Sequence, residues 1–548
     1  MGVAGGKQEK PDEQATQPIT RPPASAPPSG SRLIWSLVSL ALVLAGVGAL
    51  IVSGSYDEPV EIEQLGRSLP VNEGARNALD LSGHNSPELI RNPVDEANLV
   101  SANRIDEPRY SCALNVSFDG GGRWNQTPIP VPPGEEPKCY APDVAFDADG
   151  ILYMSYVTLA GAANAPNAVW LVRSRDGGRT LSRPTEIAPL GPNSFTARLS
   201  ADPDQPGLLY LTWLDASDLG LYRFSEPGNP IKVIRSEDGG RSWSEPVRVS
   251  GTERERVVAP SPATGPDGEL YVLYLDLGDD RLDYHGEHRG RGGPPYAGPW
   301  QLVLARSTDG GESWEESVVE EELTPSERFI VFTPPYPAIA VDQDTGRVYA
   351  GFQDAREGDP DVYVWSLESD GDEWEGPVRV NDTEAGDGSA QYRPALAVAP
   401  DGRLDVVYYD RREDSKDILN EVSYQASFDE GESFSERVPI SDESFSSRIG
   451  FGSNRGLAEL GSRLGLVSTD DRALAVWSDT RAGTLRTGKQ DIARGLVGIS
   501  DPPRLADWLE FVLRWGGIAL IVAGVAVFLL LALRLGRGGR SRPGSLSP

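Results

Sequence analysis

The feature that most constrains the fold of this chain is a short motif, Ser-x-Asp-x-Gly-x-x-aromatic, that recurs along the sequence. Its four complete copies are Ser117/Asp119/Gly121/Trp124, Ser236/Asp238/Gly240/Trp243, Ser307/Asp309/Gly311/Trp314 and Ser427/Asp429/Gly431/Phe434. A fifth copy, Ser174/Asp176/Gly178, ends in Leu181, and a degenerate sixth lies near Asp370. The recurrence of one motif along most of the chain indicates that one supersecondary unit is repeated.

Each copy has the composition of a hairpin turn. An alternating apolar run such as Ile231 to Arg235 precedes the motif, and a short strand such as Glu245 to Ser250 follows it. Asp and Ser side chains hydrogen-bond to a turn's own backbone, and Gly supplies a positive φ. The aromatic residue is expected to fold back and pack under its hairpin. We therefore expect the residues of the motif to be structural and not catalytic.

The repeated turns resemble the Asp boxes of the bacterial neuraminidase repeat (BNR) proteins, whose best known members are sialidases. The resemblance covers residues 57 to 498. It implies a sialidase-like β-propeller for that region. The 60 Gly and 45 Pro and the short apolar runs are also typical of an all-β body.

The strand pattern predicts seven blades, with six as the alternative. Each unit contains an apolar second strand, and seven can be counted: Asn98 to Asn103, Leu152 to Val157, Leu208 to Leu214, Leu270 to Leu275, Val348 to Gln353, Leu404 to Tyr409 and Ala473 to Ser478. The seventh unit lacks a fourth strand. We expect the segment from Glu58 to Ile62 to supply it beside Asp491 to Val497, which closes the ring and removes exposed sheet edges.

Two apolar stretches flank the predicted propeller, Leu33 to Val52 and Trp515 to Leu533, and each is long enough to cross a bilayer. Arginines and lysines precede the first stretch and follow the second. Because basic residues favour the cytoplasmic side, this predicts cytoplasmic termini and an extracytoplasmic propeller on a cell membrane. A cleaved signal peptide is the alternative for the first stretch. The predicted domains are a disordered tail over 1–32, membrane helices over 33–53 and 511–535, the propeller over 57–498, and a cytoplasmic tail over 536–548.

The net charge, the cysteines and the histidines limit which partners and bound groups the sequence predicts. A net charge of −31 excludes a basic nucleic-acid-binding surface. The two cysteines, Cys112 and Cys139, both lie in the predicted exported region, where a disulfide between them would persist. Three scattered histidines predict no metal site, and no cofactor is expected.

Acidic residues recur at the ends of the predicted second strands, several with an arginine two positions later. Because strands alternate in direction, these ends lie on the face opposite the repeated turns, away from the membrane. A guanidinium grips a carboxylate bidentately, so this face predicts an anion site built from Arg356, Arg393, Arg412 and Arg481. The alternative is that the repeated Asp-x-Arg pattern joins neighbouring blades.

The resemblance to sialidases implies a tyrosine nucleophile and an aspartate acid/base, for which Tyr336, Tyr392, Asp354 and Asp410 are the candidates. The Arg-Ile-Pro signature of that family is absent, since Arg104-Ile105 is followed by Asp106. The sequence therefore favours a propeller that binds a glycan or protein ligand, and an active exo-sialidase-type glycoside hydrolase is the alternative. The long loop from Gly278 to Pro299 is a further candidate functional segment.

Overall fold

The computed structural model of the 548-residue chain describes residues 29–54, 60–77, 79–191, 194, 197–216, 228–280, 298–326, 336–450, 460–500 and 507–538. These residues belong to two compact units, one over Glu61–Ser500 and the other comprising Met1–Val60 and Asp501–Pro548. The predicted tail over 1–32 lies outside the described residues except at its end, as does most of the long loop after Gly278, including His285 and His288.

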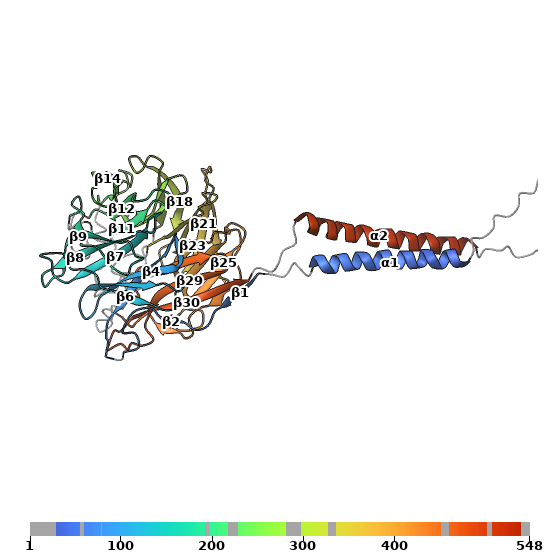
Figure 1. Ribbon diagram of the computed structural model, residues 1–548, viewed down its shortest axis with the longest axis horizontal. Helices are drawn as coiled ribbons and strands as arrows, with labels where there is room; N and C mark the ends of the chain where they lie inside the picture. The colour runs from blue at the N-terminus through green and yellow to red at the C-terminus, as the bar shows by residue number, and fades with distance from the viewer. Residues whose placement is uncertain are drawn as a thin grey trace, which may run out of the picture. The chain divides into compact units, whose positions relative to one another are not determined.

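The larger unit is a seven-bladed β-propeller (Figure 1), as the strand count predicts. The first blade contains β3 (His84–Asn92), β4 (Asp95–Ile105), β5 (Ser111–Ser117) and β6 (Asn125–Thr127). The second contains β7 (Cys139–Phe146), β8 (Leu152–Ala160), β9 (Ala165–Ser174) and β10 (Thr185–Glu186). The third contains β11 (Arg198–Ala201), β12 (Leu209–Leu214), β13 (Ile231–Ser236) and β14 (Val247–Arg248). The fourth blade contains β15 (Val257–Thr264), β16 (Leu270–Asp276), β17 (Trp300–Ser307) and β18 (Glu315–Leu323). The fifth contains β19 (Ala338–Val341), β20 (Val348–Asp354), β21 (Asp361–Leu367) and β22 (Glu375–Arg379). Blade six contains β23 (Gln391–Val398), β24 (Leu404–Asp410), β25 (Leu419–Ser427) and β26 (Val438–Pro439), with β27 (Phe445–Ser446) paired to β25.

The seventh blade joins the two ends of the propeller, as predicted, but in a different register. β28 (Gly465–Thr469), β29 (Arg472–Asp479) and β30 (Asp491–Ser500) are completed by β1 (Glu61–Gln64), which lies beside β30 in Figure 1. β1 pairs with Val497 to Ser500, and a second short strand, β2 (Leu69–Pro70), pairs with Ala493 and Arg494. The register differs from the prediction because β30 extends to Ser500 and leaves room for two short partners.

The repeated motif forms the turn between the third and fourth strands of its blades. In each copy the aspartate accepts a hydrogen bond from the serine two residues before it, at 2.6–3.0 Å. These aspartates are Asp119, Asp176, Asp238, Asp309 and Asp429. The copy that ends in Leu181 keeps the same turn, since Gly178 N lies 2.9 Å from the Ser174 hydroxyl.

The glycines of the four complete copies close these turns. Each glycine amide donates to the serine hydroxyl at 2.8–2.9 Å, and each glycine has a left-handed φ between 78° and 93°. The four residues are Gly121, Gly240, Gly311 and Gly431. A Cβ on Gly240 would lie 2.0 Å from Leu171 of the second blade, and one on Gly121 would lie 2.3 Å from Leu474 of the seventh. Gly121 and Gly240 therefore serve both the turn and its contact with the preceding blade of the ring.

The aromatic residues of the motif are half-buried, and some contact a neighbouring blade in addition to folding back onto their own hairpin. Trp124 and Trp314 donate through Nε1 to the carbonyl of the motif glycine, at 3.1 and 3.2 Å. Trp124 packs against a cluster that includes Leu474 of the seventh blade, and Phe434 packs against one that includes residues of the fifth blade. The rings stay partly exposed because they cover the seam between two blades.

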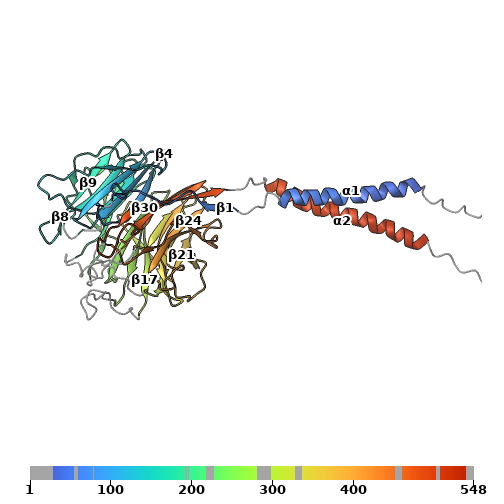
Figure 2. The same cartoon turned by 90° about the horizontal axis from the view of Figure 1, so that it is seen from below.

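The smaller unit contains two helices, α1 (Ser29–Gly54) and α2 (Asp507–Gly538), which Figure 2 also shows side by side. Each contains an apolar span that could cross a membrane, Leu33–Val52 and Phe511–Arg534. Glycines allow the two backbones to approach closely, because a Cβ on Gly46 would lie 2.5 Å from the Gly517 carbonyl oxygen. The Ser39 hydroxyl donates to the Gly524 carbonyl at 2.7 Å.

Candidate functional site

A narrow hollow, here called the mouth slot, lies where the inner strands begin. Each inner strand begins at the face where the second strand ends, and the repeated turns lie on the opposite face, since strand directions alternate. The slot is therefore on the face where the sequence predicts a ligand site. Its lining comes from five blades and consists of Ser86, Arg104, Tyr140, Ala141, Pro142, Ala197, Arg198, Tyr336, Ser462 and Arg463.

Two arginines and two carboxylates, here called the channel cluster, meet beside the slot. Arg198 contacts Glu88 through Nη2 and Asp143 through Nε, both at 3.0 Å. Arg463 contacts the same two carboxylates at 3.0 and 3.1 Å. Burial raises the pKa of Glu88, and Arg463 and Arg198 oppose that rise. The two guanidinium groups and the two carboxylates come from four blades, and their charges sum to zero.

Arg104 belongs to a second, separate ion pair at the slot. Its Nε lies 3.1 Å from Asp106 Oδ2, and its Nη1 donates to the Tyr140 hydroxyl at 2.9 Å. A disulfide joins Cys112 to Cys139, with their Cα atoms 5.5 Å apart. Cys112 faces Arg104 across β4 and β5, and Cys139 precedes Tyr140, so the disulfide ties together the strands that carry both slot residues.

The inner strands share an unusual backbone feature near the slot. In four blades the residue before a proline has a left-handed φ, namely Ser86 (52°), Ala141 (45°), Ala259 (57°) and Arg393 (53°). At each of these residues the pairing between the first and second strands of the blade shifts its register. Residues before proline normally adopt extended conformations, and strain of this kind concentrates at functional sites. Tyr336, which precedes Pro337 in the fifth blade, occupies the corresponding sequence position.

Arg393 differs from the other arginines of this face. It is only 5% exposed, and its amide donates to Gln353 Oε1 at 2.8 Å. Among the described residues its guanidinium has neither a carboxylate partner nor a hydrogen-bond acceptor, and its contact is with the Tyr392 ring, 5.8 Å from the centroid. Arg393 thus has no ion pair within the described part of the chain.

The structure places the other three predicted ligand-binding arginines in ion pairs at the ends of the second strands, here called the rim pairs. Arg356 contacts Asp354 of its own blade, and its Nη2 lies 2.7 Å from Glu320 of the blade before. Arg412 repeats this arrangement with Asp410 at 2.7 Å and with Asp382, and Arg481 with Asp479 at 2.6 Å and the Ser68 hydroxyl. Arg356 and Arg412 therefore join neighbouring blades, whereas Arg481 contacts residues of its own, seventh blade, and none of these three arginines lines the mouth slot.

The predicted catalytic residues do not lie together. Tyr336 lines the slot, with the Arg198 guanidinium carbon 5.3 Å from its ring centroid. Tyr392 is 4% exposed, donates to Asn420 at 2.7 Å and accepts from Arg411 at 3.2 Å. Asp354 and Asp410 are fully buried in the rim pairs, and burial raises the pKa of Asp354.

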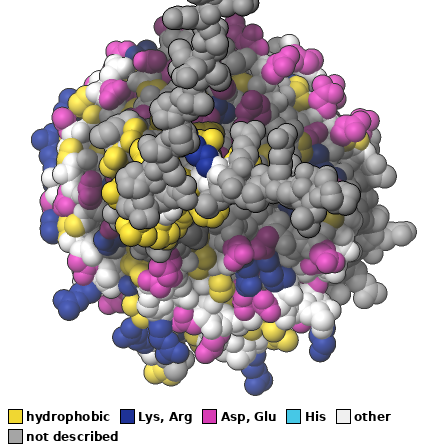
Figure 3. Space-filling model, turned by 90° about the vertical axis from the view of Figure 1, so that its right-hand side faces the viewer, with side chains coloured by type: hydrophobic (Ala, Val, Ile, Leu, Met, Phe, Trp, Pro, Cys, Tyr) yellow, Lys and Arg dark blue, Asp and Glu magenta, His cyan; other side chains and the backbone are white. Residues whose placement is uncertain are grey.

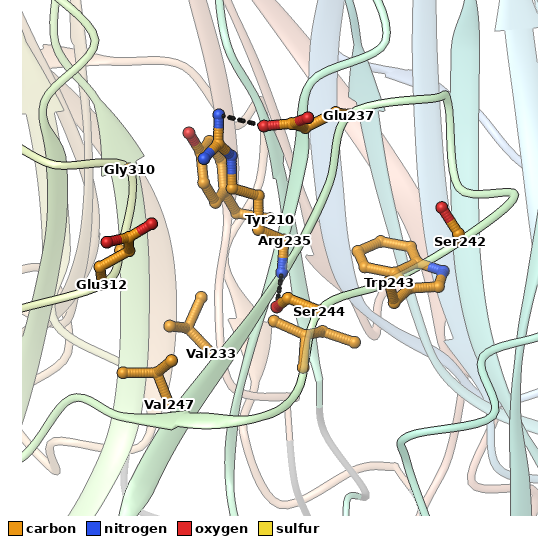
Figure 4. A pocket seen from close by; sticks show the side chains of 12 residues that line it. Tyr210, Val233, Arg235, Glu237, Ser242, Trp243, Ser244, Val247, Gly310 and Glu312 are labelled. Carbon is orange, nitrogen blue, oxygen red and sulfur yellow. Dashed lines mark hydrogen bonds and ion pairs between the residues drawn. The ribbon is translucent and has the colours of Figure 1, made fainter.

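Another hollow lies between the hairpins of the third and fourth blades, on the face of the repeated turns (Figure 4). Arg235 crosses it and contacts Glu237 at 2.8 Å, and the Arg235 amide donates to the Ser244 hydroxyl at 3.0 Å. Trp243 and Gly311, which belong to the repeated motif, form part of its lining. This hollow is a product of hairpin packing and gathers no convergent reactive groups.

The other glycines and rings of the motif line neither this hollow nor the mouth slot. They are Gly121, Trp124, Gly178, Gly240, Trp314, Gly431 and Phe434. Their contacts are with the turns and with neighbouring blades, and they lie on the face opposite the slot. The motif residues therefore belong with the fold and not with a ligand site, although they are the strongest signal in the sequence.

The described part of the face in Figure 3 shows no large patch of a single charge. Asp and Glu side chains are interspersed with Lys and Arg over the described part of the face in Figure 3. Within the described ranges no group of three His, Cys, Asp or Glu side chains could hold a metal ion. His84 is buried beside Asn103, and burial lowers its pKa to about 4.

Most slot residues were not among the sequence candidates. Arg104, Arg198, Arg463, Glu88 and Asp143 lie far apart in the chain, and only the closed ring brings them together. The sequence nonetheless contains a signal for the positions of the two carboxylates. An Xaa-Pro pair stands at the start of five inner strands, and it is followed by Glu88 in one of them and by Asp143 in another.

No known protein family and no curated protein matches the sequence. Among solved structures, a protein of unknown function from Dyadobacter fermentans is 13% identical with a TM-score of 0.44, covering 80% of this chain and 99% of its own. A PL25 ulvan lyase is 12% identical with a TM-score of 0.45, covering 79% and 96%. A Hadza microbial sialidase is 15% identical with a TM-score of 0.38, covering 74% of each chain. At these scores the likenesses carry no functional argument.

Proposed function

We propose that this chain is a membrane-anchored propeller of the Asp-box, sialidase-like class, and that its mouth binds an acidic glycan. Arg393, which lies on the same face but outside the lining of the mouth slot, carries the proposal, because it is a largely buried arginine with no acidic partner among the described residues. A buried charge without a partner is costly. A carboxylate or sulfate group on a ligand would supply the missing negative charge.

The slot itself supports an acidic, hydroxylated ligand. Three guanidinium groups, those of Arg104, Arg198 and Arg463, line it together with two tyrosines. Guanidinium groups bind carboxylates and sulfates in bidentate fashion, and tyrosines offer both a ring face and a hydroxyl to a sugar. Because the channel cluster is neutral, these arginines contribute hydrogen-bond donors more than net charge.

Binding without hydrolysis fits the state of the carboxyl groups. Glu88, Asp143 and Asp106 are all engaged by arginines, and Asp354 and Asp410 belong to the rim pairs. One observation favours the second candidate function, an exo-sialidase-type hydrolase. Tyr336 lies against Arg198, which contacts Glu88, and burial raises the pKa of Glu88 as a general acid would require.

The full chain, purified in detergent, separates these two functions. We expect N-acetylneuraminic acid or glucuronic acid to bind measurably by calorimetry and a fluorogenic sialoside not to be turned over. Arg393→Ala should weaken binding. Robust turnover that Arg393→Ala abolishes would refute the binding-only proposal and establish the hydrolase, whereas absence of binding by every acidic sugar would refute both.

The anchor is proposed from the two apolar helices, with domain limits near 33–53 and 511–535. Their spans have mean hydropathies of 2.4 and 2.7, and most of their apolar side chains remain exposed in the helix pair, as in a lipid environment. We place both termini in the cytoplasm and the propeller outside. Impermeant thiol labelling of intact cells should modify a cysteine introduced at Gly290 and not one at Ser545, and labelling at Ser545 would contradict this topology.

A further inference from the structure

A wider hollow, here called the vestibule, lies on the other side of the channel cluster. It has a volume of about 420 Å³ and is lined by the inner strands and inner turns of five blades. Pro93, Ala148 and Pro203 line it from turns between first and second strands, so it opens on the face of the repeated turns. A volume of this size is typical of small-molecule sites in proteins.

The channel cluster presents different groups to the two hollows. Glu88 and Asp143 line the vestibule and are absent from the lining of the mouth slot. Arg463 lines only the slot, and Arg198 lines both hollows. The cluster therefore separates the slot from the vestibule, and both of its carboxylates belong to the vestibule side.

Glu88 has one carboxylate oxygen that the cluster leaves unused. Arg198 Nη2 and Arg463 Nε both contact Oε2 of Glu88, each at 3.0 Å. Among the described residues no group donates a hydrogen bond to Oε1, and the side chain is 21% exposed. Both oxygens of Asp143, by contrast, contact arginines, at 3.0 and 3.1 Å. Oε1 of Glu88 is therefore the acceptor that the vestibule offers to a ligand.

The rest of the vestibule lining adds little charge and much apolar surface. Both oxygens of Asp147 already accept hydrogen bonds, from the backbone of its own turn and from the Tyr153 hydroxyl. Arg91 lies 3.7 Å from Glu96. The other lining residues are all apolar, and half-buried examples are Ile90, Phe146 and Val467.

We propose that the vestibule is a binding site for a small organic cation, separate from the mouth. Its ammonium group donates to Oε1 of Glu88, and its apolar body lies against the wall of the vestibule. An ammonium has three donors and no acceptor, and its hydrogen bond to a carboxylate is assisted by charge. The net charge of −31 also favours the approach of cations. This site does not depend on the proposed function of the mouth.

The test uses the full chain in detergent and calorimetric titration, with detergent micelles alone as the blank. Cyclohexylammonium should bind measurably, cyclohexanol should bind at least about tenfold more weakly, and cyclohexanecarboxylate should not bind. Glu88→Gln keeps the shape of the side chain and removes its charge. It should weaken cyclohexylammonium binding about tenfold and leave cyclohexanol binding within about twofold.

A matched pair of alanines tests the location of the site. Ala201 lines the vestibule, whereas Ala397, a half-buried alanine of another inner strand, does not. Ala201→Phe should fill part of the vestibule and weaken cyclohexylammonium binding about tenfold. Ala397→Phe should leave the affinity within about twofold.

Three results would overturn the inference. Failure of the unsubstituted chain to bind cyclohexylammonium would remove the site, whatever the mouth binds. Equal affinities for cyclohexylammonium and cyclohexanol would contradict the assignment of a cation to Glu88. Unchanged affinity in Ala201→Phe, or equal losses in both phenylalanine variants, would place the binding outside the vestibule. If Ala201→Phe does not fold, a loss of affinity in Val467→Phe supports the inference and an unchanged affinity overturns it.

Discussion

The rim pairs and the mouth slot both contain arginines that carboxylates hold on the same face of the propeller, yet they differ in how the blades supply them. The rim pairs repeat one local pattern, in which Arg356, Arg412 and Arg481 each contact the aspartate two residues before them. The slot combines residues from five blades that follow no common local pattern. Repeated chemistry in a propeller maintains the ring, whereas chemistry that occurs once is available to a ligand.

The largest effect should come from breaking a rim pair at its buried carboxylate. Asp410 contacts Arg412 at 2.7 Å and Arg437 at 3.3 Å and is fully buried. Asp410→Asn should lower the free energy of unfolding by about 3–5 kcal/mol, because two guanidinium groups lose a buried partner. Chemical denaturation measures this loss. Asp382→Asn, at the exposed end of the same network, should cost less than about 1 kcal/mol, and equal costs would contradict the account.

The next effect concerns the covalent link beside the mouth. Cys112 and Cys139 enclose a loop with a sequence separation of 27 residues. Replacing both by serine should lower the free energy of unfolding by about 3 kcal/mol, because the unfolded chain regains conformational freedom. The same variant should also weaken binding, since Arg104 and Tyr140 lie on the linked strands. Thermal unfolding and calorimetry measure the two effects, and a stability loss with unchanged affinity would separate the disulfide from the slot.

Asp491, which lies beside a rim pair, is unfavourable when ionised, and this gives a pH-dependent prediction. Burial raises the pKa of Asp491 from 3.8 to about 6, and Asn72 and Lys489 oppose the rise. A carboxyl whose pKa is higher in the folded protein stabilises it fully below the unfolded pKa, and this contribution disappears as the pH rises through the folded pKa. Stability should therefore decline between about pH 4 and pH 6.

Asp491→Asn should remove that decline and stabilise the protein by about 2 kcal/mol at pH 7. Asp491 faces Asp479 across β29 and β30, so the substitution also relieves a repulsion beside a rim pair. Melting temperatures measured from pH 4 to pH 8 provide the test. A variant that keeps the decline of the unsubstituted protein would show that another group causes it.

A smaller effect should distinguish equivalent glycines of the helix pair. A Cβ on Gly46 would lie 2.5 Å from the Gly517 carbonyl oxygen, whereas nothing lies within 4 Å of a Cβ on Gly48. Gly46→Leu should destabilise the pairing by about 1 kcal/mol or more and reduce disulfide crosslinking between cysteines introduced into the two helices. Gly48→Leu should leave crosslinking unchanged. Equal crosslinking in both variants would contradict the close packing.

The fold could be predicted from the sequence because each blade carries its own local signal. The Ser-x-Asp-x-Gly turns and the seven apolar second strands need only short-range information, and the lack of a fourth strand in the last unit pointed to closure by the segment before Gln64. The site was harder to predict because Arg463 and Asp143 meet only across the closed ring. The Asp-x-Arg pairs attract attention because they repeat, and that repetition marks them as parts of the fold.

The most direct test compares Arg393→Gln with Arg412→Gln in the full chain, each measured for glucuronic acid binding and for thermal stability. The account predicts that Arg393→Gln weakens binding about 10- to 100-fold without loss of stability, because its charge has no acidic partner among the described residues. Arg412→Gln should lower the melting temperature and leave the affinity unchanged, because it leaves Asp410 short of a buried partner. Loss of binding in Arg412→Gln together with full binding in Arg393→Gln would contradict the assignment of the mouth to the ligand and of the rim to the fold.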